Sequence, residues 1–362
     1  MTLRRIVIIA FVVGLGVITW MRSPVPPHDA SQKLLVERLD IAPTIEGEAE
    51  FENVWHLQSS NSDFGGYSAL LLYENGRMFA GSDGGKVLRF DAPGIGSGSG
   101  TGADAGPGTG FPGTGFGTGQ RNSTAAELGQ FSNRDTDQKT LSDLESLARD
   151  PQTGRIWAGF EGINTIERVE SDLSASVRVR PPQMQNWPSN SGPEAMARLE
   201  DGRFIVLSEG RSSWGDAKHA GLLFAGDPVG NDAAISFSFV PPDKYRPVDA
   251  VQIPDGRVLI LVRNWSVGFP LKFGVRLMIA DPAGIAQGGD WTGEQLARID
   301  DPLIAENYEG LAFGQNPDGT LALWLISDDN RATYQRTLLL KLRWDPRPSL
   351  RKTNMAKEKA RG

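Results

Sequence analysis

The chain has 362 residues, 39% of them hydrophobic, with 43 glycines, 23 prolines and no cysteine. This length suits one large repeat domain or two ordinary domains, and the lack of cysteine excludes disulfides, thiolate nucleophiles and cysteine-based metal sites. The formal net charge is -7, and it becomes -10 (34 bases against 44 acids) without Arg4, Arg5 and Arg22, which disfavours nucleic acid as a partner of the folded part.

The N-terminus carries a basic pair followed by an apolar run. Arg4 and Arg5 precede Ile6–Met21, which is long for the apolar region of a signal peptide and short for a full membrane span. No clear cleavage motif of small residues follows. We therefore expect residues 1–22 to be a signal peptide or an uncleaved membrane anchor, with the basic end in the cytoplasm. The rest of the chain is then periplasmic or secreted, and residues 6–21 tether it to the cytoplasmic membrane if they are retained.

Composition divides the remaining chain into a linker, a domain and a tail. Residues 23–33 include a proline-rich stretch and are predicted to be a linker, and residues 34–346 form the predicted domain. Within the domain, residues 93–120 consist largely of glycine, serine, threonine and proline. These residues bury too little apolar surface to offset the conformational entropy lost on ordering, so we expect a surface loop insertion. Residues 347–362 are basic and are predicted to be a flexible tail.

A strand–turn–strand unit recurs along the predicted domain. Its clearest copy is Pro193–Gly210, in which two apolar runs flank Asp201-Gly202 and an acid stands near each end, Glu194 and Glu209. The other copies are Tyr67–Gly84, Leu144–Gly162, Asp249–Asn264 and Tyr308–Asn330. Because aspartate–glycine and asparagine–glycine pairs favour tight turns, each such pair indicates a β-hairpin, and the recurrence of the unit indicates a repeat fold.

Two further strand-like pieces follow the hairpins, for example Gly221–Gly226 and Ala234–Val240. The unit is therefore a four-stranded meander, and the sequence predicts an all-β fold, a β-propeller of five to six four-stranded blades, with the N-terminal apolar helix outside it. After the fifth hairpin Thr337–Trp344 remains. We expect a strand from the N-terminal part, Leu34–Ile41 or Phe51–Gln58, to complete the last blade and close the ring, because closure removes an open sheet edge.

The acids of the unit lie symmetrically about its turn, which predicts cross-strand neighbours at the open end of each hairpin. The first strand of a propeller blade lines the central channel, so the pattern predicts two rings of polar side chains around one channel mouth. The inner ring comprises Glu145, Glu194, Asp249 and Glu309, and the outer ring comprises Glu161, Glu209, Arg263 and Asp328.

Carboxylates directly opposite each other destabilise a hairpin, so a cation or a shared proton should compensate. A hard divalent cation, Ca²⁺, is one possibility, because every candidate ligand is an oxygen. The candidate ligands are Asp83, Glu145, Glu161, Glu194, Glu209, Asp249, Glu309 and Asp328. The alternative is a structural ring in which Arg263, Arg211, Arg331 and Lys86 pair with the carboxylates, and Asp249 opposite Arg263 is predicted to be such a pair. The sequence leaves both alternatives open.

Several short stretches together resemble a known family. They are Phe64–Ser68, Ser82–Gly85, Asp143–Leu147 with Phe160–Gly162, Gly192–Met196 with Ser208–Gly210, Arg263-Asn264, and Asn307–Leu311 with Ser327–Asn330. As an ordered set they resemble the bacterial phytase-like family, whose domain is described as the esterase-like activity of phytase. The resemblance implies a secreted or periplasmic β-propeller assigned to phosphoester or ester hydrolysis, with a divalent metal. It carries over positions and assigns no catalytic roles.

We therefore expect a metal-assisted hydrolase that acts on a small phosphate ester or ester and is a monomer. In this hypothesis Ca²⁺ activates a water, Arg263 clamps phosphate oxygens, and Glu194 or Glu309 acts as the general acid or base. The alternatives are a non-catalytic binding or scaffold propeller whose acid rings are structural, and a lactonase-like propeller.

Overall fold

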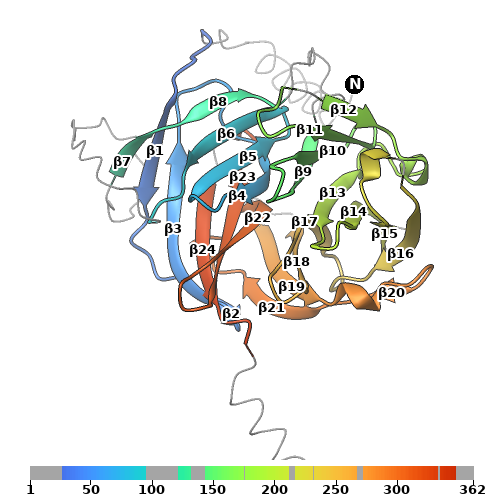
Figure 1. Ribbon diagram of the computed structural model, residues 1–362. Helices are drawn as coiled ribbons and strands as arrows, with labels where there is room; N and C mark the ends of the chain where they lie inside the picture. Colours follow the sequence, from blue (N-terminus) through green and yellow to red (C-terminus); the bar gives the residue numbers. More distant parts are fainter. Residues whose placement is uncertain are drawn as a thin grey trace, which may run out of the picture.

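The computed structural model describes residues 27–94, 121–131, 143–174, 176–211, 217–230, 232–266, 272–332 and 335–347. In this part of the chain five β-sheets stand around a central axis, and each contributes one four-stranded blade to a β-propeller (Figure 1). The predicted fold class is confirmed, with five blades. The N-terminal apolar run, most of the glycine-rich insertion and most of the basic tail lie outside the described residues. No helix among the described residues is long and apolar enough to cross a membrane.

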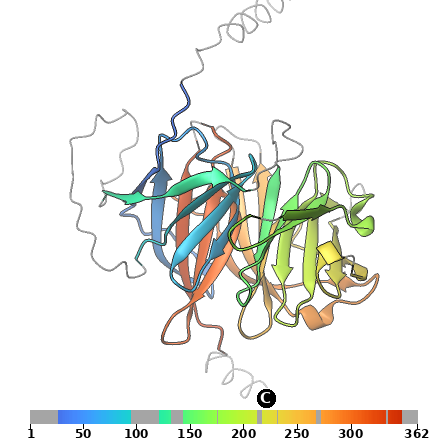
Figure 2. The ribbon, with the colours of Figure 1, turned by 45° about the horizontal axis from the view of Figure 1, so that its top comes forward.

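Each blade is an antiparallel meander whose first strand lies innermost (Figures 1 and 2). Blade 1 consists of β4 (Tyr67–Leu72), β5 (Arg77–Ser82), β6 (Lys86–Asp91) and β8 (Glu127–Gln130). Blade 2 consists of β9 (Leu144–Arg149), β10 (Ile156–Phe160), β11 (Thr165–Val169) and β12 (Ser176–Val179). Blade 3 consists of β13 (Pro193–Arg198), β14 (Phe204–Arg211), β15 (His219–Phe224) and β16 (Ala234–Phe239). Blade 4 consists of β17 (Arg246–Gln252), β18 (Val258–Ser266), β19 (Lys272–Ala280) and β21 (Glu294–Ile299).

Blade 5 joins the two ends of the described chain. It consists of β22 (Asn307–Gln315), β23 (Leu321–Asp328), β24 (Thr337–Trp344) and β3 (Glu50–Gln58), so an N-terminal strand completes the last blade as predicted (Figure 1). The pairing of β3 with β24 places Val54 opposite Leu340. Two more strands, β1 (Lys33–Arg38) and β7 (Arg121–Ala125), extend the outer edge of this sheet. Hydrogen bonds between the two ends of the chain therefore close the ring.

A few short elements supplement the blades. The strand β20 (Asp290–Trp291) pairs in parallel with β16, and β2 (Glu46–Gly47) pairs with β21. Among the described residues, single-turn 3-10 helices are found at Pro182–Met184, Pro228–Gly230 and Pro282–Gly284.

The turn between the first and second strands uses the same chemistry in several blades. In blade 3, Gly202 adopts φ +89°, a left-handed conformation that glycine reaches without strain. The residue before it, Asp201, accepts a hydrogen bond from Arg203 N at 3.1 Å through Oδ1. The same arrangement recurs at Asp255 and at Asp318, which accept from the second residue after them. The recurring aspartate–glycine pairs therefore set where each hairpin turns.

The hydrophobic core is divided among the spaces between neighbouring blades. Five buried clusters occur among the described residues, and each draws its side chains from two adjacent sheets. Between blades 5 and 1, for example, Trp324 of β23 belongs to one buried cluster with Leu70 of β4 and Met78 of β5. Packing between sheets thus holds the innermost strands side by side around the axis.

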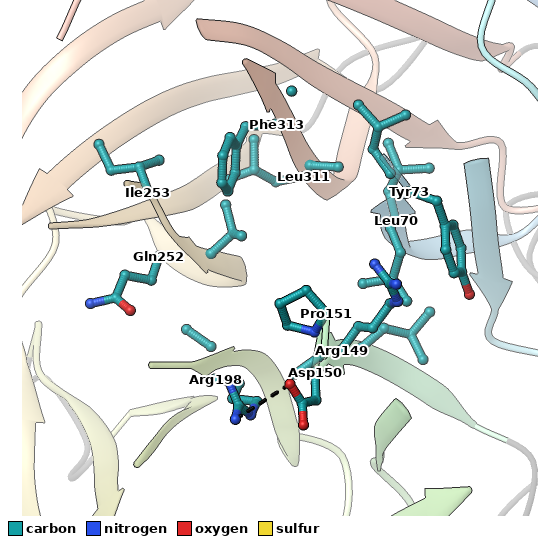
Figure 3. A pocket seen from close by; sticks show the side chains of 18 of the residues that line it. Leu70, Tyr73, Arg149, Asp150, Pro151, Arg198, Gln252, Ile253, Leu311 and Phe313 are labelled. Atoms are coloured by element: carbon teal, nitrogen blue, oxygen red, sulfur yellow. Dashed lines mark ion pairs between the residues drawn. The ribbon is translucent and has the colours of Figure 1, made fainter. Parts of the chain in front are cut away.

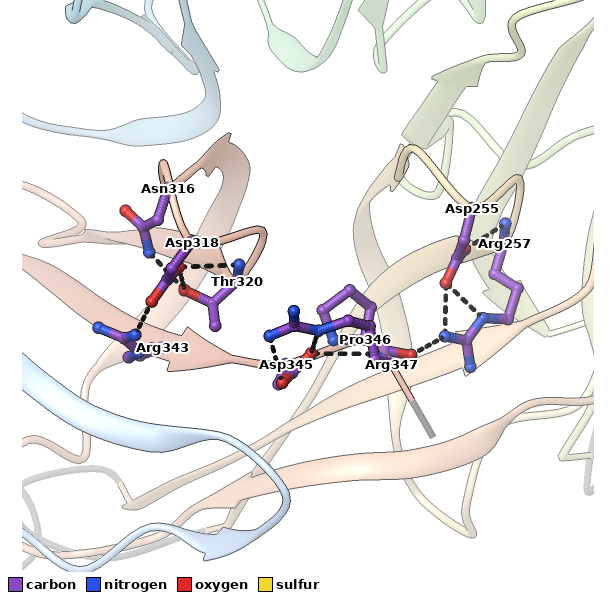
Figure 4. Close-up of polar contacts among 9 residues, drawn as sticks. All are labelled: Asp255, Arg257, Asn316, Asp318, Thr320, Arg343, Asp345, Pro346 and Arg347. Atoms are coloured by element: carbon purple, nitrogen blue, oxygen red, sulfur yellow. Dashed lines mark hydrogen bonds and ion pairs between the residues drawn. The ribbon is translucent and has the colours of Figure 1, made fainter. Parts of the chain in front are cut away.

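The end of β24 is tied to the turns of blades 4 and 5 (Figure 4). Arg257 Nη2 donates to the carbonyl oxygen of Pro346 at 3.3 Å and pairs with Asp255, and Arg343 pairs with Asp318. These contacts lie at the hairpin-turn end of the propeller. The polar residues predicted to carry chemistry lie at the other end.

Candidate functional site

A bulge near the start of the first strand shapes the polar end of every blade. In blade 3, Pro193 lies opposite Ser208 and Ala195 opposite Leu207, which leaves Glu194 as the extra residue. The extra residues of the five blades are Ser68, Glu145, Glu194, Val248 and Glu309. A bulge removes its extra residue from the ladder and re-aims the side chain. We call the end of the propeller where these five residues lie the acidic end.

The predicted direct pairing of acids across each hairpin is wrong in register. Because the bulge displaces Glu145, Glu194 and Glu309 from the ladder, none of them lies directly opposite an acid of the second strand. In blade 5 the residue opposite Asp328 is Asn307, which precedes the bulge. The acids are therefore diagonal neighbours, and side chains from different blades approach one another.

Three carboxylates of blade 2 converge at the acidic end. Asp143, Glu145 and Glu161 each place a carboxylate oxygen within 4.8 Å of the others, and all three are partly exposed. Burial, followed by the charges of Glu309 and Asp143, raises the pKa of Glu145 well above its usual value. Burial also raises the pKa of Glu161 to about 7. This is the kind of all-oxygen cluster that a hard divalent cation prefers.

Glu194 of blade 3 adjoins these three carboxylates. It is 6% exposed, and burial, followed by the charges of Glu145 and Glu209, raises its pKa well above the usual value. A hydrogen bond between the carboxyl groups of Glu194 and Glu161 lowers the pKa of Glu161 and partly offsets the effect of burial. A hydrogen bond between two carboxyl groups needs a proton on one of them. We call Asp143, Glu145, Glu161 and Glu194 the carboxylate half of the acidic end.

Arginines neutralise the acids on the other side of the axis. Arg263 Nη2 lies 2.9 Å from Glu309 Oε1 and 3.4 Å from Glu209 Oε1, and Arg246 Nη1 lies 3.3 Å from Glu209 Oε2. The side chains of Arg263, Glu209 and Glu309 are 18%, 12% and 9% exposed. Burial lowers the pKa of Arg263, but the charges of Glu309 and Glu209 outweigh it and raise this pKa above its ordinary value. We call these four residues the arginine half.

Blade 5 adds a third acid beside the arginine half. Asn307 Nδ2 donates to Glu309 Oε1 at 2.8 Å and to Asp328 Oδ2 at 3.2 Å. Burial and the charge of Glu309 raise the pKa of Asp328 to about 8. Asp83 of blade 1 is close enough that its charge contributes to the raised pKa values of Glu309 and Asp328.

Asp249 does not belong to the acidic end. It lies opposite Leu261, whereas Arg263 lies opposite Arg246, so the predicted Asp249–Arg263 pair is wrong. Its carboxylate is 2% exposed and accepts hydrogen bonds from Leu311 N at 2.6 Å and from Ala250 N at 2.8 Å. Asp249 therefore fastens β17 to β22.

The structure places two of the other three predicted counter-ions. Lys86 Nζ lies 3.3 Å from Asp63 Oδ1, a carboxylate that was not among the predicted ring residues. Arg331 packs against Gly84: a Cβ atom added to this glycine would lie 3.0 Å from Arg331 Nη2. The side chain of Arg211 lies outside the described residues.

Three residues of the site were not singled out from the sequence. Asp143, Arg246 and Asn307 each stand two positions before the bulge residue of their blade. Side chains two apart on a strand point to the same face, so for Asp143 and Asn307 a polar residue two positions before an acid was the available signal, whereas Arg246 precedes Val248 and gave no such signal.

Comparison with known proteins gives a family and a set of similar folds. The model of the family "Phytase-like: Esterase-like activity of phytase" matches residues 62–331. No curated protein matches the chain. Among solved structures, a nidogen/laminin complex is similar at 8% identity, covering 87% of this chain and 93% of that chain, with a TM-score of 0.38. A luciferin-regenerating enzyme is similar at 10% identity, covering 83% of this chain and 95% of that chain, with a TM-score of 0.42. The calcium-binding protein regucalcin from Agrobacterium tumefaciens strain C58 is similar at 14% identity, covering 86% of this chain and 96% of that chain, also with a TM-score of 0.42.

Proposed function

Because this chain belongs to the phytase-like family described by the esterase-like activity of phytase, we propose that it is a hydrolase of small phosphate esters that works with a divalent cation at the acidic mouth of its channel. The observation that carries the proposal is the convergence of three carboxylate oxygens, from Asp143, Glu145 and Glu161, within 4.8 Å. The apolar run Ile6–Met21 after two arginines supports an extracytoplasmic location.

The donor set of the carboxylate half fits Ca²⁺. All the candidate ligand atoms are oxygens. The raised pKa values of Glu145 and Glu161 indicate that their negative charge is unfavourable in this site, and a bound cation would neutralise that charge. Asp143, Glu145 and Glu161 would hold the ion. When bound, it supplies positive charge for a phosphate group and lowers the pKa of a water.

Glu194 suits the role of general acid. Burial and the neighbouring acids raise its pKa, which favours the protonated carboxyl, and its hydrogen bond to Glu161 places the group beside the three carboxylates. A carboxyl in this state can give its proton to the leaving oxygen of an ester.

Arg263 and Glu309 suit a supporting role. Glu309 and Glu209 hold the guanidinium of Arg263 by ion pairs at 2.9 and 3.4 Å. A phosphate would have to compete with both carboxylates for Arg263, so we assign Arg263 to attracting and orienting the anion by its charge, with Glu309 fixing the position of the guanidinium.

The arginine half is also the observation that favours the second candidate function. If buried ion pairs such as those of Arg263 account for all the charge at this end, the acids are structural and the propeller is a binding or scaffold module. The two functions differ in whether the carboxylate half needs a cation.

The proposal is tested by hydrolysis of p-nitrophenyl phosphate and p-nitrophenyl acetate, each measured with CaCl₂ and with EDTA. We expect phosphate hydrolysis that is lost with EDTA and in Glu145→Gln. The matched control is Glu170→Gln, an exposed glutamate paired with Arg155 on blade 2, which should retain full activity. Activity on the acetate ester alone would reassign the substrate class. Undiminished phosphate hydrolysis in EDTA or in Glu145→Gln, or no hydrolysis of either ester with calcium, would contradict the proposal.

A further inference from the structure

A cavity opens at the end of the propeller opposite the acidic end. Phe313 lies four residues beyond Glu309 on β22, which is about 13 Å along a strand. At that level a cavity of about 740 Å³ is lined by residues of all five innermost strands. Small-molecule pockets commonly measure ~300–1,000 Å³. The space is therefore large enough for a small organic ligand.

The two walls of the cavity have different chemistry (Figure 3). Residues at the same distance beyond the bulge in the five blades are Leu72, Arg149, Arg198, Gln252 and Phe313. Blades 4, 5 and 1 contribute partly exposed apolar side chains, including Leu72, Val251 and Phe313. Blades 2 and 3 contribute the two arginines. Each of these apolar side chains keeps some surface in contact with the cavity, so a ligand with a hydrocarbon or aromatic body would remove that surface from water.

Arg149 has hydrogen-bonding capacity left over. Its Nη1 lies 3.2 Å from both carboxylate oxygens of Glu74, a side chain that is 69% exposed at the rim. Its guanidinium also stacks over the ring of Tyr73, 4.3 Å from the centroid. Its Nε, however, is buried without a hydrogen-bond partner. A guanidinium has five N–H donors, and Glu74 bonds to Nη1, so the remaining donors at the end of the guanidinium, rather than the buried Nε, are those that a ligand in the cavity would meet.

Arg198 stands beside Arg149 on the next blade. Its Nη2 lies 3.5 Å from Asp150 Oδ1, which is longer than a charge-assisted hydrogen bond of about 2.7–2.9 Å. Asp150 is itself committed to its own turn, because it accepts from Gln152 N and from Thr153 Oγ1. The two arginines therefore face the cavity with weak or exposed counter-ions.

We propose that this cavity binds a small amphiphilic anion, with its apolar body against Leu72 and Phe313 and its carboxylate or phosphate group against Arg149 and Arg198. The positive charges of Arg149 and Arg198 favour an anionic head group, and the apolar side chains of Leu72 and Phe313 favour a hydrocarbon or aromatic body. The site is independent of the proposed hydrolysis, because it lies at the other end of the innermost strands and shares no residue with the acidic end.

The test is isothermal titration of the full chain with octanoate, octyl phosphate and octanol. We expect the anions to bind at one site, with the tighter one identifying the head group, and octanol to bind at least about tenfold more weakly, since it lacks a charged acceptor. Arg149→Gln and Arg198→Gln should each weaken binding of the anions by about tenfold, because each removes one positive charge from the head-group site. The matched control Arg155→Gln, an exposed arginine outside the cavity, should bind as the native chain does.

Two further variants separate this site from folding defects and from the acidic end. Val251→Trp keeps both arginines but fills part of the cavity, so it should weaken binding of the anions and of octanol alike. Glu194→Gln should leave binding of octanoate unchanged whatever it does to hydrolysis. Three results would overturn the proposal: no binding of either anion, octanol binding as tightly as the anions, or unchanged affinity in a folded Arg149→Gln, Arg198→Gln double variant.

Discussion

Blades 2 and 4 carry opposite charges at equivalent positions of the same backbone. Blade 2 has Asp143 two places before the bulge, Glu145 at the bulge, and Glu161 across from Asp143 just after the second strand. Blade 4 has Arg246, Val248 and Arg263 at those places. The repeat supplies the positions, and the residue type at each position decides whether a blade gathers negative charge or neutralises that of its neighbours.

The difference matters because the two blades reach different neighbours. Arg246 and Arg263 satisfy Glu209 and Glu309 of the flanking blades at 2.9 to 3.4 Å. The carboxylates of blade 2 instead lie beside another acid, Glu194, and burial together with the charges of neighbouring acids raises the pKa values of Glu145 and Glu194. In the arginine half the acids are therefore neutralised by ion pairs, whereas the carboxylate half keeps an excess of carboxyl groups that a cation would neutralise.

The largest effect is expected from removing the central arginine. Arg263→Gln leaves the buried carboxylates of Glu309 and Glu209 short of a counter-ion, and breaking such a pair costs about 3–5 kcal/mol. Urea unfolding should show this loss. The matched control is Arg246→Gln: its side chain is 37% exposed and Glu209 keeps Arg263, so we expect less than about 1 kcal/mol. Equal losses in the two variants would mean that Arg263 is not the central counter-ion.

The next effect is on the reaction. Glu194→Gln removes the protonated carboxyl that we assign as general acid, and loss of such a group lowers kcat by about a hundredfold or more. Its stability should not fall, because the amide removes one titrating group from a crowded set of acids. A variant with native kcat for p-nitrophenyl phosphate would show that Glu194 does not take part in the reaction.

The sequence predicted more of the fold than of the site. Aspartate–glycine turns such as Asp201-Gly202 and the leftover strand Thr337–Trp344 were enough to predict the blades and the closure of the ring. The bulge was not visible, because it depends on how two strands pair rather than on any residue type. Symmetry about the turn therefore placed Asp249 in the ring, where the structure has Val248. Asp143 and Arg246 were missed for the same reason, since their relation to the site runs through the bulge.

A smaller effect is expected on the pH dependence of stability without calcium. The folded-state pKa of Glu161 is about 7 against an ordinary value of 4.5, and that of Asp328 is about 8 against 3.8. Between those limits the folded chain binds more protons than the unfolded chain, so the free energy of unfolding falls as pH rises. Thermal unfolding in EDTA should show a Tm that decreases from pH 5 to pH 8. A Tm that rises over this range would contradict the raised pKa values.

The smallest effect is expected at the far end of blade 4. Arg257→Gln removes a partly exposed ion pair with Asp255 and a hydrogen bond to Pro346. Exposed pairs contribute about 0–1 kcal/mol. Urea unfolding should therefore place this variant close to the native chain, and a loss as large as that of Arg263→Gln would show that charge at the two ends of the blade matters equally.

Calcium binding by isothermal titration tests the contrast between the two blades most directly. We expect one ion to bind per chain, binding to be lost in Glu161→Gln, and binding to survive in Arg246→Gln. No heat of binding with the native chain, or native affinity in Glu161→Gln, would contradict a cation site on the carboxylate half and would leave the acidic end as a structural network of ion pairs.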